Sequence, residues 1–263
     1  MAEVLIDNGI PTDLFSIQGH VTLLTGAAGE APTQTVLAGS GLATFNADPS
    51  ITNMDHHIKS LNNDNTADSG FHAETWSSKL TESMNRHQSL KEKVDNTTVT
   101  TVFPLEGLSD QFKLVTRLMQ TRVSRGSKRD IFFVQDGGYD THDNVDASLI
   151  INFGRINGAI QAFVNELKIL NLWESTTVVQ FSEFARTLNP NTGDGSDHGW
   201  YVTIYGDTTM CLSFHINFLL TTQIILTPIG EVITSCSEER SRVGRYLVST
   251  PLSSTKAKAA TMP

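Results

Sequence analysis

The stretch that most constrains the fold is DIFFVQDGGYDTHDN, residues Asp130 to Asn144. Its apolar part, Ile131 to Val134, has the length and the β-branched and aromatic content of a buried parallel strand. We expect the strand to end at the two glycines that follow Asp136, because glycine gives the backbone a freedom that other residues lack. Polar residues come next, and ligands of open α/β sheets bind just beyond the carboxyl ends of strands. The stretch therefore predicts an α/β fold with a candidate site at this strand end.

Two side chains that can bind a metal stand two residues apart after the glycines. In extended backbone, residues i and i+2 point to the same side, so Asp140 and His142 are able to converge on one ion. The alternative is a polar turn in which Asp140 and Asp143 cap the next helix, since aspartate is common at helix starts. Both interpretations fit this stretch taken alone.

A long helix and a second strand follow. Apolar residues recur at helical spacing from Leu149 to Leu170, and TTVVQF, residues Thr176 to Phe181, is typical of a short buried strand. A strand–helix–strand unit forms a right-handed crossover with parallel strands, so both strands should end at one sheet edge. The loop after the second strand contains Asp197 and His198, which we expect beside the first Asp-His pair. Carboxylate and imidazole groups together are ligands for a hard or borderline divalent cation.

The remaining pattern predicts an α/β three-layer sandwich with a mainly parallel central sheet in residues 1–200. Helices over Leu108–Val123 and Ala147–Leu170 are expected to cover the faces of this sheet. Residues 201–263 lack clean periodicity and are expected to form a separate segment with a disordered tail. Further elements are expected as strands over Leu14–Ile17, Val21–Leu24 and Val36–Phe45 and as a surface helix over Phe71–Val94.

Composition excludes several classes of protein. The formal net charge of -9 disfavours a nucleic-acid partner, which normally meets a basic surface. The N-terminal residues lack the features of a signal peptide, and the apolar segment Leu212–Ile229 contains too many polar residues for a membrane span. Cys211 and Cys236 stand at no motif spacing. The adjacent His56 and His57 diverge on a helix or strand, so a solvated helix start is favoured over a ligand role.

The pieces GGYDTHDN, SEFART and DHGW together resemble the bacterial and algal family called domain of unknown function 1501. The resemblance is dense from Phe103 to Trp200, and the family itself resembles the alkaline phosphatase and sulfatase superfamily. It implies an alkaline phosphatase-like fold and a divalent metal ion, either zinc, calcium, magnesium or manganese. The ligands it implies are Asp140, His142, Asp197 and His198.

The same resemblance places Glu183 and Arg186 beside the site. Glu183 is expected to orient a ligand or act as a base, and Arg186 to hold an anionic group of the substrate. For both residues, an ion pair that fixes the loop is the alternative.

The chain also departs from the family pattern. It begins without the family's first strand, acidic ligand and nucleophile segment, so the fold is expected to be incomplete and the nucleophile is unknown. Ser16, Thr25 and Ser40 are candidates by residue type only. After Trp200 the resemblance ends, and His215 is considered as a replacement ligand.

The expected function is that of a metal-dependent hydrolase acting on a small anionic phosphate or sulfate ester. The alternative is a non-catalytic remnant of the same fold that serves as a binding or structural protein. The family resemblance implies export from the cell, although the chain shows no such signal.

Overall fold

A computed structural model of the protein describes residues 2–25, 34–38, 41–42, 50–63, 70–105, 107–181, 184–187, 189–199, 204–207 and 222–228. All of these residues belong to one compact unit, Met1–Ile229. Its elements are α1 (Ala2–Asp7), β1 (Thr12–Ser16), the 3-10 helix η1 (Thr22–Leu24), β2 (Thr35–Val36), α2 (Met54–Asn63), α3 (Gly70–Asp95), α4 (Gly107–Gln120), α5 (Arg122–Arg125), β3 (Arg129–Asp136), α6 (Val145–Ile169), the 3-10 helix η2 (Trp173–Ser175), β4 (Thr176–Phe181), β5 (Ala185–Arg186), β6 (His198–Gly199), β7 (Ile204–Asp207) and β8 (Thr222–Pro228). Within these ranges, no helix combines the length and the apolar character needed to cross a membrane.

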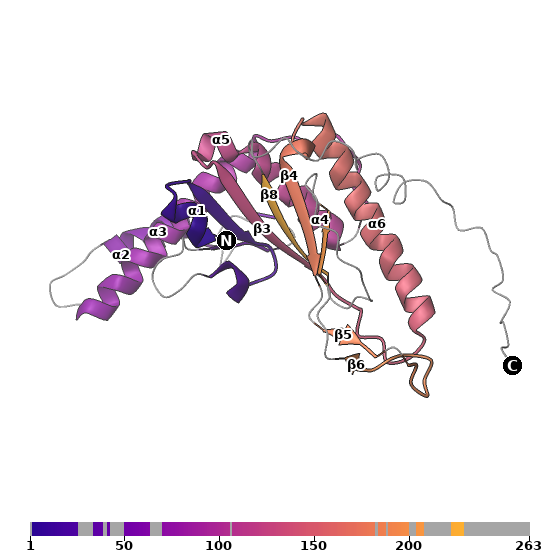
Figure 1. Ribbon diagram of the computed structural model, residues 1–263. Coiled ribbons are helices and arrows are strands. Elements are labelled where there is room, and N and C mark those ends of the chain that lie inside the picture. The colour runs from indigo at the N-terminus through magenta and orange to yellow at the C-terminus, as the bar shows by residue number, and fades with distance from the viewer. Residues whose placement is uncertain are drawn as a thin grey trace, which may run out of the picture. The chain divides into compact units, whose positions relative to one another are not determined.

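The described residues form a six-stranded sheet in the order β2-β1-β3-β8-β4-β7 (Figure 1). Strand β1 pairs in parallel with β2 and β3, whereas β8 is antiparallel to β3 and β4, and β7 is antiparallel to β4. Strands β1 to β4 therefore all run in one direction, as the crossover prediction requires, and their carboxyl ends lie at one edge. The α/β class is confirmed.

The sheet is mixed, which corrects the expectation of a mainly parallel sheet. Strands β3 and β4 are not neighbours, because β8 lies between them and pairs with both. Both β7 and β8 come from beyond residue 200, so the segment expected to be separate contributes two strands to the same sheet. Cys211, Cys236 and His215 lie outside the described residues.

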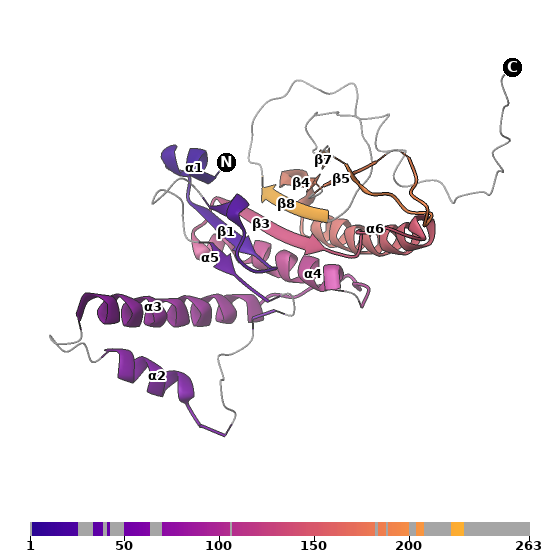
Figure 2. The same ribbon diagram turned by 90° about the horizontal axis from the view of Figure 1, so that it is seen from below.

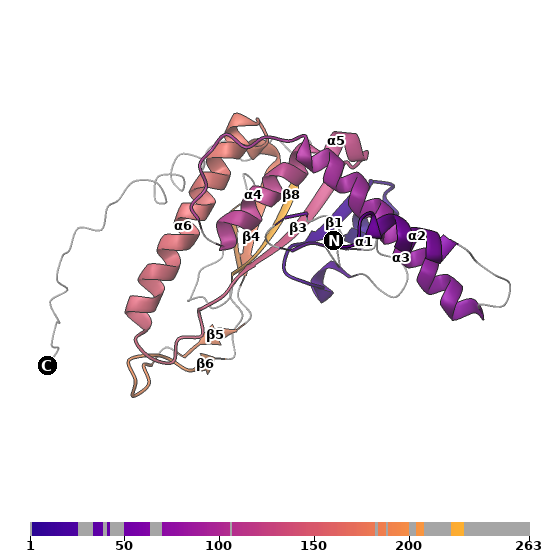
Figure 3. The same cartoon turned by 180° about the vertical axis from the view of Figure 1, so that it is seen from behind.

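Helices α4 and α6 pack on the same face of the sheet (Figure 3). Phe132 and Val134 of β3 are fully buried there with Phe112 of α4 and Phe163 of α6. The rings of Phe112 and Phe163 stack with their centroids 4.7 Å apart. The two helices were expected to cover both faces, but their apolar stripes also pack against each other, which places them side by side.

The opposite face of the sheet carries a smaller core. Ile131 and Phe133 of β3 form this core with Leu14 of β1 and Leu24, and Leu5 of α1 packs against it. Figure 2 shows α1 on the side of the sheet opposite α4. The expected strand over Val21–Leu24 is instead the 3-10 helix η1, and α1 was not expected at all. Short apolar runs do not distinguish a strand from a helical turn, which explains both errors.

Other predicted elements agree with the structure to within a few residues. Strand β4 has the predicted bounds, and α3, α6 and β1 differ from their predictions by one or two residues at each end. The predicted helix over Leu108–Val123 is divided at Thr121 into α4 and α5. Strand β2 covers only the start of the strand expected over Val36–Phe45, and most of that range lies outside the described residues.

A buried carboxylate fixes α6 to the segment that precedes α4. Glu166 of α6 is fully buried, and its two oxygens accept hydrogen bonds from the amides of Thr100 at 2.9 Å and Thr101 at 2.7 Å. Burial acts to raise the pKa of Glu166, but the hydrogen bonds from Thr101 and Thr100 together outweigh it and lower that pKa. The charged carboxylate is therefore the form that the fold stabilises.

We predict that Glu166→Gln lowers the free energy of unfolding at pH 7 by about 1–3 kcal/mol, because the amide leaves one of the two partly buried N–H groups of Thr100 and Thr101 without an acceptor. The lowered pKa makes this contribution fully present above the ordinary glutamate pKa and lost as the pH falls through the folded-state pKa. Urea unfolding of both proteins should therefore show curves that converge in acid. Glu174→Gln, at an exposed position of η2, is the control. Equal stability of Glu166→Gln and the wild type at pH 7 would contradict the prediction.

Candidate metal centre

Two loops carry the candidate site, and both follow strands that end at the same sheet edge. The first loop, residues 137–144, connects β3 to α6. The second loop, described at residues 184–187 and 189–199, follows β4 and contains the short pair β5 and β6. Figure 1 shows β5 and β6 beyond the ends of β3 and β4, beside the start of α6.

Backbone hydrogen bonds join the second loop to the start of α6. The amide of Asn144 donates to the carbonyl of Gly193 at 3.3 Å, and the amide of Val145 donates to the carbonyl of Asp194 at 3.1 Å. Amides at a helix start have no partner within the helix, so the second loop supplies the cap. The N-cap Asn144 has φ 45° and makes no side-chain cap hydrogen bond. In the part of the chain that the structure describes, no hydrogen bond joins the side chain of Asp140 or Asp143 to the start of α6, so the capping alternative is not observed.

One asparagine side chain strengthens this connection. The Nδ2 of Asn191 donates to the carbonyl of His142 at 2.9 Å and to Oδ1 of Asp197 at 3.3 Å. Its Oδ1 accepts from the amides of Gly193 at 2.9 Å and Gly195 at 3.0 Å. Asn191 thus fixes the turn of the second loop and its distance from His142 at the same time.

The loops approach so closely that one position excludes a side chain. A Cβ atom at Gly195 would lie 2.2 Å from both the carbonyl carbon and the carbonyl oxygen of His142. Backbone atoms cannot yield to such an overlap, so only glycine permits the observed distance.

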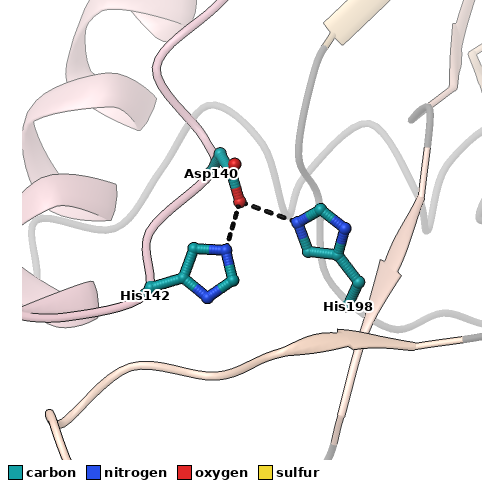
Figure 4. Close-up of side chains that lie close together, drawn as sticks. All are labelled: Asp140, His142 and His198. Carbon is teal, nitrogen blue, oxygen red and sulfur yellow. Dashed lines mark hydrogen bonds and ion pairs between the residues drawn. The ribbon is translucent and has the colours of Figure 1, made fainter.

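Three potential metal ligands meet where the loops come together (Figure 4). Oδ1 of Asp140 lies 3.0 Å from Nε2 of His142 and 2.8 Å from Nε2 of His198. The ligand atoms of all three residues lie within 4.8 Å of one another. The side chains are 48–59% exposed, so the cluster is open to solvent. The structure thus brings together His198 of the second loop with both members of the first pair.

The environment of Asp140 favours the ionised form of its carboxyl group, which a metal ligand requires. The hydrogen bond with His198 lowers the pKa of Asp140. Burial opposes this effect, but the charges of His142, His198 and Arg186 lower the pKa further, so the net shift is downward. The carboxyl group therefore stays ionised well into acid, which is the form that binds a cation.

Asp197, which was expected among the ligands, contacts a different atom from Asp140. Its Oδ1 lies 3.2 Å from Nδ1 of His142, whereas Asp140 faces Nε2 on the other side of the ring. Hydrogen bonds from Asn191 and His142 lower the pKa of Asp197. The geometry is that of a carboxylate that orients an imidazole through the nitrogen that does not face the cluster.

The buried side chain of Arg186 forms hydrogen bonds to both loops. Its side chain is only 6% exposed, and its Nη2 donates to Oδ1 of Asp140 at 2.8 Å and to the carbonyl of Tyr139 at 3.2 Å. Its Nη1 donates to the carbonyl of Ser196. Burial lowers the pKa of Arg186 and Asp140 opposes that effect, but a guanidinium keeps its charge at any physiological pH. These contacts match the alternative of a loop-fixing ion pair.

Among the residues that the structure describes, none of the other predicted candidates is part of the cluster. Glu183 and Ser40 lie outside the described residues. Ser16 is fully buried at the end of β1 and donates to the carbonyl of Gly19, while Thr25 is exposed and donates to the carbonyl of Thr22. His56 and His57 are exposed on α2, as expected of a solvated helix.

The sequence interpretation missed Asn191 and Phe184. The ring of Phe184 stacks on that of His198 with 3.7 Å between centroids, and Cζ of Arg186 lies 5.4 Å from the Phe184 centroid. The run Asn191-Thr-Gly is a signal for a turn in which the asparagine oxygen accepts an amide two residues on, which is observed. No comparable signal predicts the contacts of its Nδ2 or the stacking of Phe184.

The donor set of the cluster fits a divalent cation of borderline character. Two imidazole nitrogens with one carboxylate oxygen suit zinc or manganese better than calcium or magnesium, which prefer oxygen ligands. Three protein ligands leave coordination positions open, as in catalytic rather than structural zinc sites. With neutral histidines, Asp140, Asp197 and Arg186 together leave a net negative charge that favours a cation.

Comparison with known proteins gives one match. The model of a family described as "Protein of unknown function (DUF1501)" matches residues 35–206. This range contains both loops, β3, α6 and β4. Neither a curated protein nor a solved structure matches the chain.

We predict that Gly195→Ala separates the two loops, because the added Cβ would overlap the backbone of His142. The measurement is amide hydrogen exchange at Val145, whose amide donates to Asp194 of the second loop. Exchange should become faster by about tenfold or more as this hydrogen bond opens. Gly154→Ala, on α6 with nothing within 4 Å of the new atom, is the control. Unchanged protection of Val145 in Gly195→Ala would refute the close approach.

Proposed function

Because the chain belongs to the DUF1501 family of proteins of unknown function, whose model matches residues 35–206, we propose a metal-dependent hydrolase of the alkaline phosphatase and sulfatase type. Its substrate is a small phosphate or sulfate ester. The observation that carries the proposal is the cluster of Asp140, His142 and His198, with ligand atoms within 4.8 Å of one another. The proposal includes the three-layer sandwich of that superfamily, and the co-directional strands β1 to β4 support it.

Each residue of the cluster has a defined task in this proposal. Asp140, His142 and His198 hold the cation, and their exposure leaves room for an ester beside it. A bound divalent cation supplies Lewis acidity at an ester oxygen and offsets the negative charge that develops in the transition state. Arg186 keeps Asp140 in place by its ion pair at 2.8 Å, and Phe184 supports the ring of His198 by stacking.

A second candidate function is a non-catalytic remnant of the same fold, which keeps the cation to hold its loops and serves as a binding or structural protein. The observation that favours it is that the described candidates for anion binding and for nucleophilic attack already donate hydrogen bonds to other atoms of the protein. The terminal nitrogens of Arg186 donate to protein atoms of the two loops, and the hydroxyls of Ser16 and Thr25 donate to carbonyls of their own turns.

We predict that the purified protein binds one zinc or manganese ion per chain. Asp140→Ala and His198→Ala should each lower the affinity by about a hundredfold or more, because each removes one of three protein ligands. Isothermal titration calorimetry measures both the stoichiometry and the affinity. His57→Ala, at an exposed position of α2, is the matched control and should bind like the wild type. Absence of binding by the wild type, or equal affinities of all four proteins, would refute the metal centre.

Turnover decides between the two candidate functions. If the protein is a hydrolase, a panel of aryl phosphate and aryl sulfate esters should contain a substrate whose hydrolysis requires zinc or manganese. This activity should be lost in Asp140→Ala and retained in His57→Ala, because only the former removes a ligand. Metal binding without turnover of any ester in the panel would favour the remnant.

A further inference from the structure

The imidazole of His142 is approached by a carboxylate at each of its two nitrogens. Oδ1 of Asp140 lies 3.0 Å from Nε2, and Oδ1 of Asp197 lies 3.2 Å from Nδ1. Nε2 of His142 and Nε2 of His198 lie beside the same oxygen, Oδ1 of Asp140. The Nε2 side of His142 is therefore the side that belongs to the cluster. The two carboxylates therefore occupy different positions relative to the ring, although both come from motifs of the same Asp-His composition.

An imidazole ring can offer a metal only a nitrogen that carries no proton. A partner that accepts a hydrogen bond from the N–H of one ring nitrogen keeps the proton there, leaves the other nitrogen free for the metal and fixes the orientation of the ring. At His142 the group beside Nδ1 is the carboxylate of Asp197, whose Oδ1 lies 3.2 Å away.

Asp197 is itself held at this position. Its Oδ1 accepts from Nδ2 of Asn191 at 3.3 Å, and the same Nδ2 donates to the carbonyl of His142 at 2.9 Å. The backbone of Asp197 is paired with Thr187, since its amide donates to Oγ1 at 3.3 Å and its carbonyl accepts from the Thr187 amide at 2.9 Å. The carboxylate is thus fixed relative to both the backbone and the side chain of His142.

We propose that Asp197, held by Asn191, is a positioning residue that accepts a hydrogen bond from the protonated Nδ1 of His142 and keeps Nε2 directed at the metal. This inference rests on the proposed metal centre, but it assigns Asp197 a role different from that of a fourth ligand. The ligands are then Asp140, His142 and His198, and Asp197 acts only through His142.

The first test compares two variants that remove the same charge from the same loop. Asp197→Asn removes the acceptor carboxylate, and Asp194→Asn removes a neighbouring charge at a position with φ 55°, a conformation that asparagine tolerates. In zinc titrations, Asp197→Asn should bind about 10–100-fold more weakly than the wild type, the usual effect of losing such a partner. Asp194→Asn should differ from the wild type by less than about threefold, because it changes only the general charge of the loop.

The second test determines which ring nitrogen of His142 carries the proton. Long-range nitrogen–proton correlation spectra of the zinc-loaded wild type should show His142 with a protonated Nδ1 and a metal-bound Nε2. The Nδ1 proton should resonate far downfield in the wild type and in Asp194→Asn, and this shift should be lost in Asp197→Asn. Cobalt-substituted wild type and Asp197→Asn should show the same visible absorption bands, because the ligands themselves are unchanged.

The outcomes separate the inference from the proposed function. Wild-type binding with equal weakening in both variants, or a His142 bound through Nδ1, overturns the positioning role and leaves the metal centre intact. A change in the cobalt bands of Asp197→Asn identifies Asp197 as a ligand and also overturns it. Absence of zinc binding by the wild type overturns the metal centre and the inference together. Similar melting temperatures of the metal-free proteins would show that a loss of affinity is not a loss of folding.

Discussion

The candidate site depends on the hydrogen bonds that attach the loop after β4 to the start of α6. Two carbonyls of this loop cap the first amides of α6, and Asn191 connects the same loop to the carbonyl of His142. A single hydrogen bond contributes only about 0.5–1.5 kcal/mol to stability, so the attachment relies on several bonds acting together and on the close approach at Gly195. This attachment, together with the hydrogen bonds of Arg186 to both loops, holds the side chains of Asp140 and His198 at contact distance.

The sheet brings the two loops close enough for this attachment to form. Strands β3 and β4 run in the same direction although β8 lies between them, so both chains leave the sheet at the same edge. Beneath the sheet, Phe132 of β3 is buried with Phe163 of α6, and Glu166 joins α6 to the segment before α4. The loops are therefore attached to a well-packed core, while the side chains of the cluster are about half exposed. An open cluster on a rigid support suits a site that exchanges ligands with solvent.

The sequence was sufficient for the longer helices, for strands β3 and β4 and for the side chains that meet in the cluster, but not for α1 or η1. The helical period of α6 and the apolar run of β4 depend on neighbouring residues, and the rule that parallel strands end at one edge placed the two Asp-His pairs together. The position of β8 was not predictable in the same way, because pairing with β3 and β4 depends on contacts far apart in sequence. The different contacts of Asp140 and Asp197 were also not predictable. The direction of each side chain is set by loop backbone that has no repeating period, such as the left-handed residues Asn144 and Asp194.

The position of β8 has a consequence for the order in which the protein can be assembled. A ribosome releases the strand at Thr222–Pro228 after every residue of the cluster, yet this strand supplies the hydrogen bonds that fill the space between β3 and β4. During synthesis, β3 can pair with β1 as soon as β3 has been made. The edge of β4 that faces β3 stays unpaired until β8 follows. Closure of the sheet is a late, long-range event, which is the slow type of step in protein folding. The nascent chain therefore carries both halves of the site before it has the strand that sets their spacing.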